Sequence, residues 1–470
     1  MSAEVPAAVV AICFAGHAVS SKSSKRRAVL RLGARHGDGV QAPLVQYDKA
    51  AGRLLAKQDI EQGEVLLHEA PLILVEDENG KSQDGEIDMQ LWMKDRCLRA
   101  MSIFDDVQQD VREQIMDLFC PEHSPTMLQA SGLDLSGDEL QFLRILSACG
   151  ISVAENKTGL YRLASRANHS CRPNSGNCVK DSGALQMVAL RNLSAGEEVT
   201  ISYLPHADLL RPGRWRREKL SMTWDFQCGC PRCTGADDTR SLCCPSCVDN
   251  GHYSSNPLRG RVVFTSRSLM LGQAVTEVTR WSACNVCGAE HFRDDLDDSE
   301  EAWIDKFHEL PSDCQQPSTL RSRRWQQAAA SDEVLEQHDR AGLQALCELD
   351  AELLNAASEV LGEAVPAPEA HWLSARLAAA VAEAHLLLGQ PTKAIDATRR
   401  WQNFVRHAMG NDVVVMDSCL AMATEASALV QLGRHMDAKQ LWQAALHEAN
   451  MLGLEQDDLV LAPQLPLSTL

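Results

Sequence analysis

The feature that most constrains this fold is the clustering of cysteines in the middle of the chain. Of the 17 Cys in 470 residues, ten fall in one stretch: Cys171, Cys178, Cys228, Cys230, Cys233, Cys243, Cys244, Cys247, Cys284 and Cys287. A disulfide framework is typical of small secreted domains, which this chain does not resemble in length. Thiolates at such short spacing are typical of metal ligands in a reducing compartment.

The segment QCGCPRC supplies three of these thiolates, Cys228, Cys230 and Cys233. Zinc takes four ligands at the corners of a tetrahedron, so one ligand is missing. Cys171, in the stretch SRANHSCRPN (165–174), is the natural fourth. A zinc site of these four residues would tie that stretch to a distant segment. Cys178 fits a buried thiol better than a ligand.

A second set of four combines CCPSC (243–247) with CNVC (284–287). The two C-x-x-C pairs are Cys244 with Cys247 and Cys284 with Cys287, and Cys243 could replace Cys244. This spacing predicts a zinc-ribbon-like module over 236–292, and therefore two zinc sites in all. Redox activity is the poorer alternative, because no thioredoxin-like strand and helix pattern surrounds either pair.

The rest of the chain alternates between strand and helix patterns. Residues from Met89 to Cys149 follow helical spacing, which predicts a helical insertion at about 88–150. Short β-compatible stretches, separated by turn signals, predict strands at Arg53–Ala56, at Glu64–Glu69, after Pro71, and within 184–193 and 197–204. The predicted fold class is therefore α+β.

The C-terminal third is rich in Ala and Leu, which predicts a helical domain over 320–470. Two segments, AEAHLLLGQPTKAIDA (382–397) and TEASALVQLGRHMDAK (424–439), share a Leu-Gly pair and an Ala five residues after its Gly. The similarity favours degenerate tetratricopeptide-like hairpins, and an irregular helical bundle is the alternative. The acidic stretch RDDLDDSEEAW (293–303) before this domain is interpreted as part of a solvated linker, 293–319.

The charge balance indicates which classes of partner the chain would attract or repel. With 45 Lys and Arg against 64 Asp and Glu, the formal net charge is −19. The chain should therefore repel nucleic acid and anionic membranes, and we expect it to bind neither. A basic partner, such as a Lys-rich protein tail, would be attracted, although many acidic proteins are merely soluble.

The N-terminal extension, 1–46, begins with an apolar run, VPAAVVAICFAGHAV, and continues rich in Ser and Arg with few acids. The pattern is that of an organelle-targeting segment, and a disordered terminus is the alternative. Without such targeting, the expected location is the nucleus or cytoplasm.

Four motifs together resemble a SET-domain protein lysine methyltransferase, nearest to the SET-and-MYND type. They are NHSCRPN (168–174), AGEEVTISY (195–203), FQCGCPRC (226–233) and GRLLAKQDIEQGEVLLHEAPL (52–72). The resemblance predicts a β-rich SET domain over 47–235 whose first Cys set is a post-SET zinc site. No MYND zinc finger is expected, because only Cys97, Cys120 and Cys149 occur between 77 and 150.

The resemblance implies S-adenosylmethionine-dependent methylation of a lysine in a histone or another protein. It places Asn168 and His169 on the cofactor, Tyr203 beside the transferred methyl in the catalytic role, and Phe226 on the adenine. Gly52 and Arg53 would belong to the first cofactor loop. A capped turn at Asn168 and His169, and a core position for Tyr203, are the structural alternatives.

The sequence also departs from the family pattern. Ala51 and Arg53 occupy the two positions where relatives have Gly, and Trp224 stands where many relatives have a channel Tyr. These changes favour a rival hypothesis, in which a catalytically weak or inactive SET fold serves as a scaffold. In that case partner proteins would bind the C-terminal helices.

Overall fold

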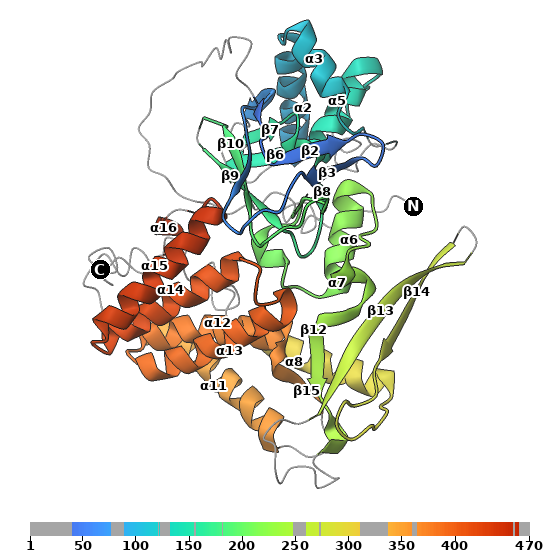
Figure 1. Cartoon of the computed structure of the whole chain (residues 1–470). Helices are drawn as coiled ribbons and strands as arrows, with labels where there is room; N and C mark the ends of the chain where they lie inside the picture. Colours follow the sequence, from blue (N-terminus) through green and yellow to red (C-terminus); the bar gives the residue numbers. More distant parts are fainter. Residues whose placement is uncertain are drawn as a thin grey trace. The chain divides into compact units, whose positions relative to one another are not determined.

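The computed structural model describes residues 40–76, 89–120, 122, 132–154, 157–180, 182–247, 260–271, 274–310, 337–359, 364–454 and 456–459. The chain forms two compact units (Figure 1). The first extends to Pro205 and includes Glu218–Cys228, and the second consists of His206–Arg217 and the chain from Gly229 onward. Residues 1–39 of the expected N-terminal extension lie outside the described residues.

Short strands build the first unit. An antiparallel sheet has the order β1 (Val40–Gln41), β4 (Val65–Glu69), β10 (Leu185–Ala189) and β9 (Ser175–Val179). Smaller pairings join β2 (Val45–Asp48) to β3 (Arg53–Ala56), β5 (Ile73–Glu76) through β7 (Lys157–Leu160) to β6 (Ile151–Ala154), and β8 (Asn168–His169) to β11 (Thr200–Ile201). Inward-facing residues of the four-stranded sheet and of the β2–β3 pair, such as Leu54, Leu66 and Met187, are fully buried in one core. The predicted strands at 53–56 and 64–69 are confirmed as β3 and β4.

The helical pattern between Met89 and Cys149 is also confirmed. It forms α2 (Met89–Asp105), α3 (Gln109–Met116) and α5 (Gly137–Cys149). Their apolar faces meet in a separate core, where the rings of Phe104 and Phe142 stack at 4.1 Å. Ile73 and Val75 of β5 belong to the same core, so the insertion packs against the edge strand β5.

The second unit is built on another antiparallel sheet. Its order is β14 (Ala274–Trp281), β13 (Arg261–Leu271), β12 (Ala236–Cys243) and β15 (Val365–His371). The expected zinc-ribbon-like module over 236–292 therefore does not have a sheet of its own, because β15 comes from the region expected to be almost entirely helical. Val365 pairs with Cys243 at the end of β12.

The expected acidic linker is wrong over its first half. Residues Arg293–His308 form the helix α8. Leu296, Trp303 and Phe307 lie on one face of the helix and are buried, while most of the acids face outward. Asp294 and Asp295 occupy the first turn, where the helix dipole favours negative charge. Residues 311–319 of the linker lie outside the described residues.

The C-terminal region is helical, as predicted. It contains α11 (Gln337–Glu359), α12 (Trp372–Leu387), α13 (Pro391–Met409), α14 (Met416–Gln431), α15 (His435–Met451) and α16 (Gln456–Leu459), and α12 to α15 pack in chain order (Figure 1). The two Leu-Gly pairs close α12 and α14 in the same way. Gly389 and Gly433 both have positive φ, at 69° and 74°, which ends each helix. Ala394 and Ala438, the equivalent residues of the following helices, are both fully buried.

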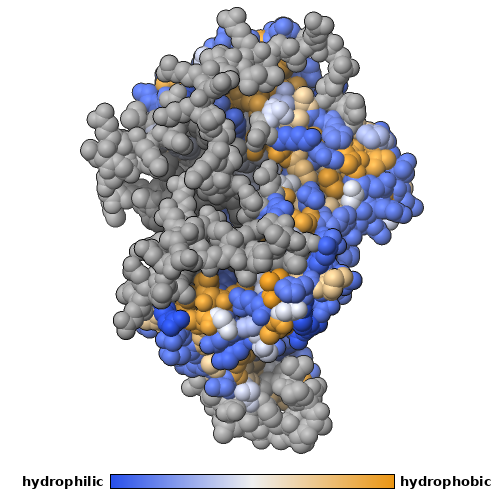
Figure 2. Space-filling view, turned by 90° about the vertical axis from the view of Figure 1, so that its left-hand side faces the viewer, coloured by the Kyte–Doolittle hydropathy of each residue, from blue (hydrophilic) through white to orange (hydrophobic). Residues whose placement is uncertain are grey.

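The surface of the described residues is mixed in polarity. On the face drawn in Figure 2, hydrophilic residues alternate with smaller apolar patches. Among the residues that the structure describes, no helix has the length and apolar character needed to span a membrane.

Candidate functional site

Two of the sequence motifs meet at a short parallel pairing in the first unit. Asn168 and His169 of β8 lie opposite Thr200 and Ile201 of β11. The pairing continues past His169, because Ser170 N donates to Ile201 O at 2.9 Å. This register brings the Asn-His pair next to the segment that carries Tyr203.

The side chain of buried Asn174 hydrogen-bonds to the backbone of β11 and of the residues before it. Its Oδ1 accepts from the backbone N of Thr200, and its Nδ2 donates to the carbonyl oxygen of Glu198, both at 2.8 Å. The side chain replaces backbone partners for the strand that ends near Tyr203. The sequence interpretation named Asn174 only as the end of the motif and missed this positioning role.

Asn168 is exposed and faces the turn between β2 and β3. Its Nδ2 donates to the carbonyl oxygen of Gly52 at 3.2 Å and to Oε1 of Glu198 at 2.8 Å. These bonds use both amide hydrogens, so the side chain presents its Oδ1 as an acceptor. Glu198 was missed as a site residue, although the Gly-Glu-Glu motif contained it.

The turn at Gly52 leaves room beside Asn168. Gly52 has a φ of 66°, and a side-chain carbon there would meet nothing within 4 Å. Its N donates to Asp48 O at 2.8 Å, which closes the turn. Arg53 follows as the first residue of β3, opposite Asp48, with an exposed side chain.

Four rings form an aromatic cluster next to this turn and strand. The ring of Tyr203 lies 5.3 Å from that of His169, 5.5 Å from Trp224 and 6.2 Å from Phe226. Trp224 is the last residue of α6 (Gly213–Trp224), and Asp225 then reverses the chain with a φ of 57°. The structure therefore brings together Tyr203, His169 and Phe226, which the resemblance placed around the cofactor, with Trp224, which it placed at the channel.

Tyr203 is a neutral phenol in this setting. Burial raises its pKa far above the ordinary value of 10.0, and the nearby Cys149 and Glu198 act in the same direction. Its hydroxyl donates to the carbonyl oxygen of Ala167 at 3.0 Å. The phenol hydrogen is thus engaged, and the group offers a ligand the lone pairs of its oxygen.

The first predicted Cys set comes together. The sulfurs of Cys171, Cys228, Cys230 and Cys233 all lie within 4.8 Å of one another, and we name this set the Cys171 cluster. Three of these residues are buried, and Cys230 is half-buried. Four thiols at this separation match the donor set of a structural zinc site.

His169 connects the Cys171 cluster to the backbone of Tyr203. Its Nδ1 accepts from Tyr203 N at 3.0 Å, and its Nε2 lies 3.3 Å from Cys171 Sγ. Because Nδ1 is an acceptor, the neutral ring carries its hydrogen on Nε2 and donates it to the sulfur. The sequence placed His169 on a cofactor and did not anticipate this bridge.

The second predicted Cys set also comes together. The sulfurs of Cys244, Cys247, Cys284 and Cys287 lie within 4.8 Å of one another, and we name this set the Cys244 cluster. Cys243 is the last residue of β12 and lies outside the set. Cys178 lies in β9, also outside both clusters, and burial raises its pKa to about 11.

A histidine that the sequence interpretation missed contacts the Cys244 cluster. His291 Nε2 lies 3.1 Å from Cys244 Sγ. The available signal was its position four residues after Cys287, a spacing common around zinc ligands.

Comparison with known proteins finds a family match within the first unit. Residues 53–204 match the family model of the SET domain. A segment of 114 residues is 38% identical to the Protein-lysine N-trimethyltransferase SMYD5 of Gallus gallus, covering 24% of this chain and 27% of that protein. A segment of 89 residues is 39% identical to the Histone-lysine N-methyltransferase SMYD3 of Mus musculus, covering 19% of this chain and 20% of that protein. The chain thus spans about a quarter of the length of these relatives.

A solved structure, the SET domain of LSMT bound to lysine and AdoHcy, aligns with 80% of this chain and 90% of its own. Its identity is 12% and its TM-score is 0.24.

Proposed function

The chain contains a SET domain at residues 53–204 and has homologues among SMYD-type lysine methyltransferases, and from this we propose that it is an S-adenosylmethionine-dependent protein lysine N-methyltransferase. The observation that carries the proposal is the convergence of Gly52, Asn168, Tyr203 and Phe226 on one part of the first unit.

The residues present fit the cofactor. The Oδ1 of Asn168 is an acceptor suited to an ammonium group, and the space beside Gly52 leaves room for a ligand along the backbone. Phe226 offers a ring for stacking an adenine. When bound, S-adenosylmethionine would supply an electrophilic methyl group.

Tyr203 contributes orientation and not base catalysis. Its raised pKa keeps the phenol protonated, so it is not suited to take a proton from a lysine. Its oxygen lone pairs would instead help align a neutral amine with an electropositive methyl group, while the surrounding rings limit access of water. Trp224 would narrow the lysine channel on one side.

The proposed substrate is a lysine-containing protein, either a histone or a non-histone protein. The net charge of −19 supports a Lys-rich substrate, since opposite charge accelerates association. We further propose that the C-terminal hairpins α12–α13 and α14–α15 are tetratricopeptide-like and offer a surface for a partner protein. The equivalent Gly389 and Gly433 turns support this.

We propose that the Cys171 cluster is the post-SET zinc site. Zinc there would fix Cys171, two residues after His169, to the segment that follows Phe226. The Cys244 cluster is the second proposed zinc site. Both clusters fit a reducing compartment, the nucleus or the cytoplasm.

The test combines calorimetric titration of S-adenosylmethionine with radiolabelled methyl transfer to a Lys-rich protein mixture. Asn168→Ala should weaken cofactor binding by about 1–3 kcal/mol, because it removes the side chain that would hydrogen-bond to a partly buried ligand. Tyr203→Phe should keep most of the binding and lower turnover.

Asn192→Ala and Tyr47→Phe are matched controls, since both residues lie in the first unit and are not part of the proposed site. Both should behave as the unmodified protein. An unmodified protein that contains zinc but neither binds the cofactor nor transfers methyl would refute the enzyme and favour the scaffold.

A further inference from the structure

Three nitrogen atoms lie within hydrogen-bond distance of sulfurs in the Cys244 cluster. The backbone N of Gly260 donates to Cys247 Sγ at 3.2 Å, and the backbone N of Val286 donates to Cys284 Sγ at 3.4 Å. His291 Nε2 reaches Cys244 Sγ at 3.1 Å. Three of the sulfurs thus have an N–H group or imidazole directed at them.

The position of Gly260 shows how closely the backbone approaches these sulfurs. A side-chain carbon at Gly260 would lie 2.6 Å from Cys247 Sγ and still closer to Cys284 Sγ. Only glycine lets the chain pass near enough for its N–H to reach the sulfur. Neutral thiols are weak acceptors, whereas thiolates accept such bonds strongly, so this arrangement suits sulfurs that carry negative charge.

We propose that the Cys244 cluster is a tetrathiolate zinc site in which His291 is a positioning residue that donates its Nε2–H to the Cys244 sulfur. Zinc binding displaces one proton from each of the four thiols, and the zinc with four thiolates then carries a net charge of −2. The three N–H donors offset part of this charge. Second-shell donors of this kind orient ligands and strengthen metal binding.

The site would join two parts of the sheet in the second unit. Cys244 N donates to Gly260 O at 2.7 Å, and Asn285 N donates to Arg261 O at 3.1 Å. Zinc would add a clamp where β12 ends, where β13 begins and where the chain leaves β14. Helix α8 starts at Arg293, directly after His291 and Phe292.

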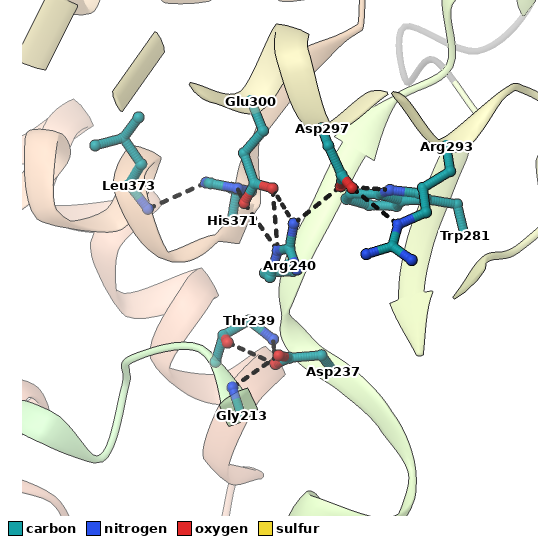
Figure 3. Close-up of polar contacts among 10 residues, drawn as sticks. All are labelled: Gly213, Asp237, Thr239, Arg240, Trp281, Arg293, Asp297, Glu300, His371 and Leu373. Atoms are coloured by element: carbon teal, nitrogen blue, oxygen red, sulfur yellow. Dashed lines mark hydrogen bonds and ion pairs between the residues drawn. The ribbon is translucent and has the colours of Figure 1, made fainter. Parts of the chain in front are cut away.

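Helix α8 is also attached to the sheet by a buried polar network (Figure 3). The carboxylate of Glu300 accepts from the guanidinium of Arg240 on β12 and lies 2.9 Å from Nε2 of His371 at the end of β15. Asp297, one turn earlier, accepts from Trp281 Nε1 of β14 at 3.0 Å. Zinc would fix the segment that leads into α8, while this network holds α8 itself to the sheet, so loss of zinc should loosen the start of the helix.

The test counts zinc in the full-length protein by inductively coupled plasma mass spectrometry. The unmodified protein should contain two zinc ions per chain, and Cys284→Ser should contain one. A count of one in both proteins would overturn the proposal. Methyl transfer is measured on the same samples, and because the proposal does not rest on it, the two hypotheses can fail separately.

His291 variants keep the proposal testable if Cys284→Ser fails to fold. His291→Ala should retain zinc but bind it about 10- to 100-fold more weakly in competition with a chelator. His308→Ala, which removes an exposed histidine of the same unit, is the matched control and should bind as the unmodified protein.

Two further readouts separate positioning from general folding. His291→Gln can still donate an N–H and should recover part of the affinity. In cobalt-substituted protein, His291→Ala should shift the thiolate-to-cobalt charge-transfer band, whereas His308→Ala should not. Equal affinity of His291→Ala and His308→Ala, or no recovery by His291→Gln, would overturn the role of His291.

Discussion

His169 makes two hydrogen bonds with different partners, and two substitutions of this residue can remove them one at a time. Its Nδ1 accepts a hydrogen bond from the backbone N of Tyr203 at 3.0 Å, and its Nε2 donates one to the sulfur of Cys171 at 3.3 Å. Asn can present an acceptor near the place of Nδ1 but is too short to reach the sulfur. Gln can present a donor near the place of Nε2. The two substitutions should therefore affect different functions.

The expected magnitude follows from the bonds that are lost. Leaving the backbone N of Tyr203 without its acceptor, at a partly buried position, should cost about 1–3 kcal/mol. If that energy appears in the alignment of Tyr203 during methyl transfer, turnover falls about 5- to 150-fold in His169→Gln. His169→Asn should keep most of the turnover.

The zinc readout should show the opposite order. His169→Asn loses the donor to Cys171 and should release zinc from the Cys171 cluster to a chelator about 10- to 100-fold more readily. His169→Gln should hold it better. The assays are steady-state methyl transfer and chelator competition, and His68→Ala, an exposed histidine on β4, is the control. Equal losses in both assays for Asn and Gln would refute a bridge with two separable ends.

Three other changes test the remaining structure. Burial alone would raise the pKa of Glu300, but hydrogen bonds from His371 and Arg240 outweigh it and lower the pKa from the ordinary 4.5 to about 2. Between pH 4.5 and 2 the unfolded chain therefore binds a proton that the folded chain does not. Glu300 thus contributes roughly 3 kcal/mol to the free energy of unfolding above pH 4.5, and this contribution is lost as the pH falls toward 2. Denaturation curves of Glu300→Gln should show less of this acid dependence. Trp303→Ala should lower the free energy of unfolding by about 3–5 kcal/mol, and exposed Glu301→Ala by less than about 0.5, whereas equal effects would mean that α8 is not packed. Association of a Lys-rich peptide, followed by stopped flow, should slow as salt rises, because a charge of −19 is screened within about 8 Å at physiological ionic strength; a salt-independent rate would contradict electrostatic steering.

The parts of the fold that could be predicted have local signals. β3 and β4 show apolar residues between turn residues, and the helices between Met89 and Cys149 show regular apolar spacing. β15 lacks such a signal, because VPAPEAH contains two prolines and no alternation of polar and apolar residues. Proline is tolerated in an edge strand, and β15 occupies the edge of its sheet beside β12. Only the tertiary pairing makes it a strand.

α8 was missed for a different reason. Its acids dominate the composition and suggest a solvated linker, but the apolar residues that decide its structure are few and widely spaced. Leu296 and Trp303 are seven residues apart, which places them on one helix face, and the sheet beneath supplies the burial that stabilises them. The number of acids in this segment cannot show that another part of the chain forms a sheet on which its apolar residues can be buried.

The candidate site divides along the same line between local and tertiary information. The short spacings typical of zinc ligands predicted Cys228, Cys230 and Cys233 and the two C-x-x-C pairs, whereas Cys171 was assigned as the missing fourth ligand from a distant motif. The structure brings both sets together. The groups that touch the sulfurs depend on tertiary placement, yet both clusters have a histidine near a cysteine in the sequence. His169 lies two residues before Cys171, and His291 lies four residues after Cys287. The contacts differ, since His169 binds the sulfur of its near neighbour while His291 crosses to Cys244 on the other side of its cluster. Proximity in sequence therefore nominates a second-shell histidine, but the sulfur that it contacts follows only from the fold.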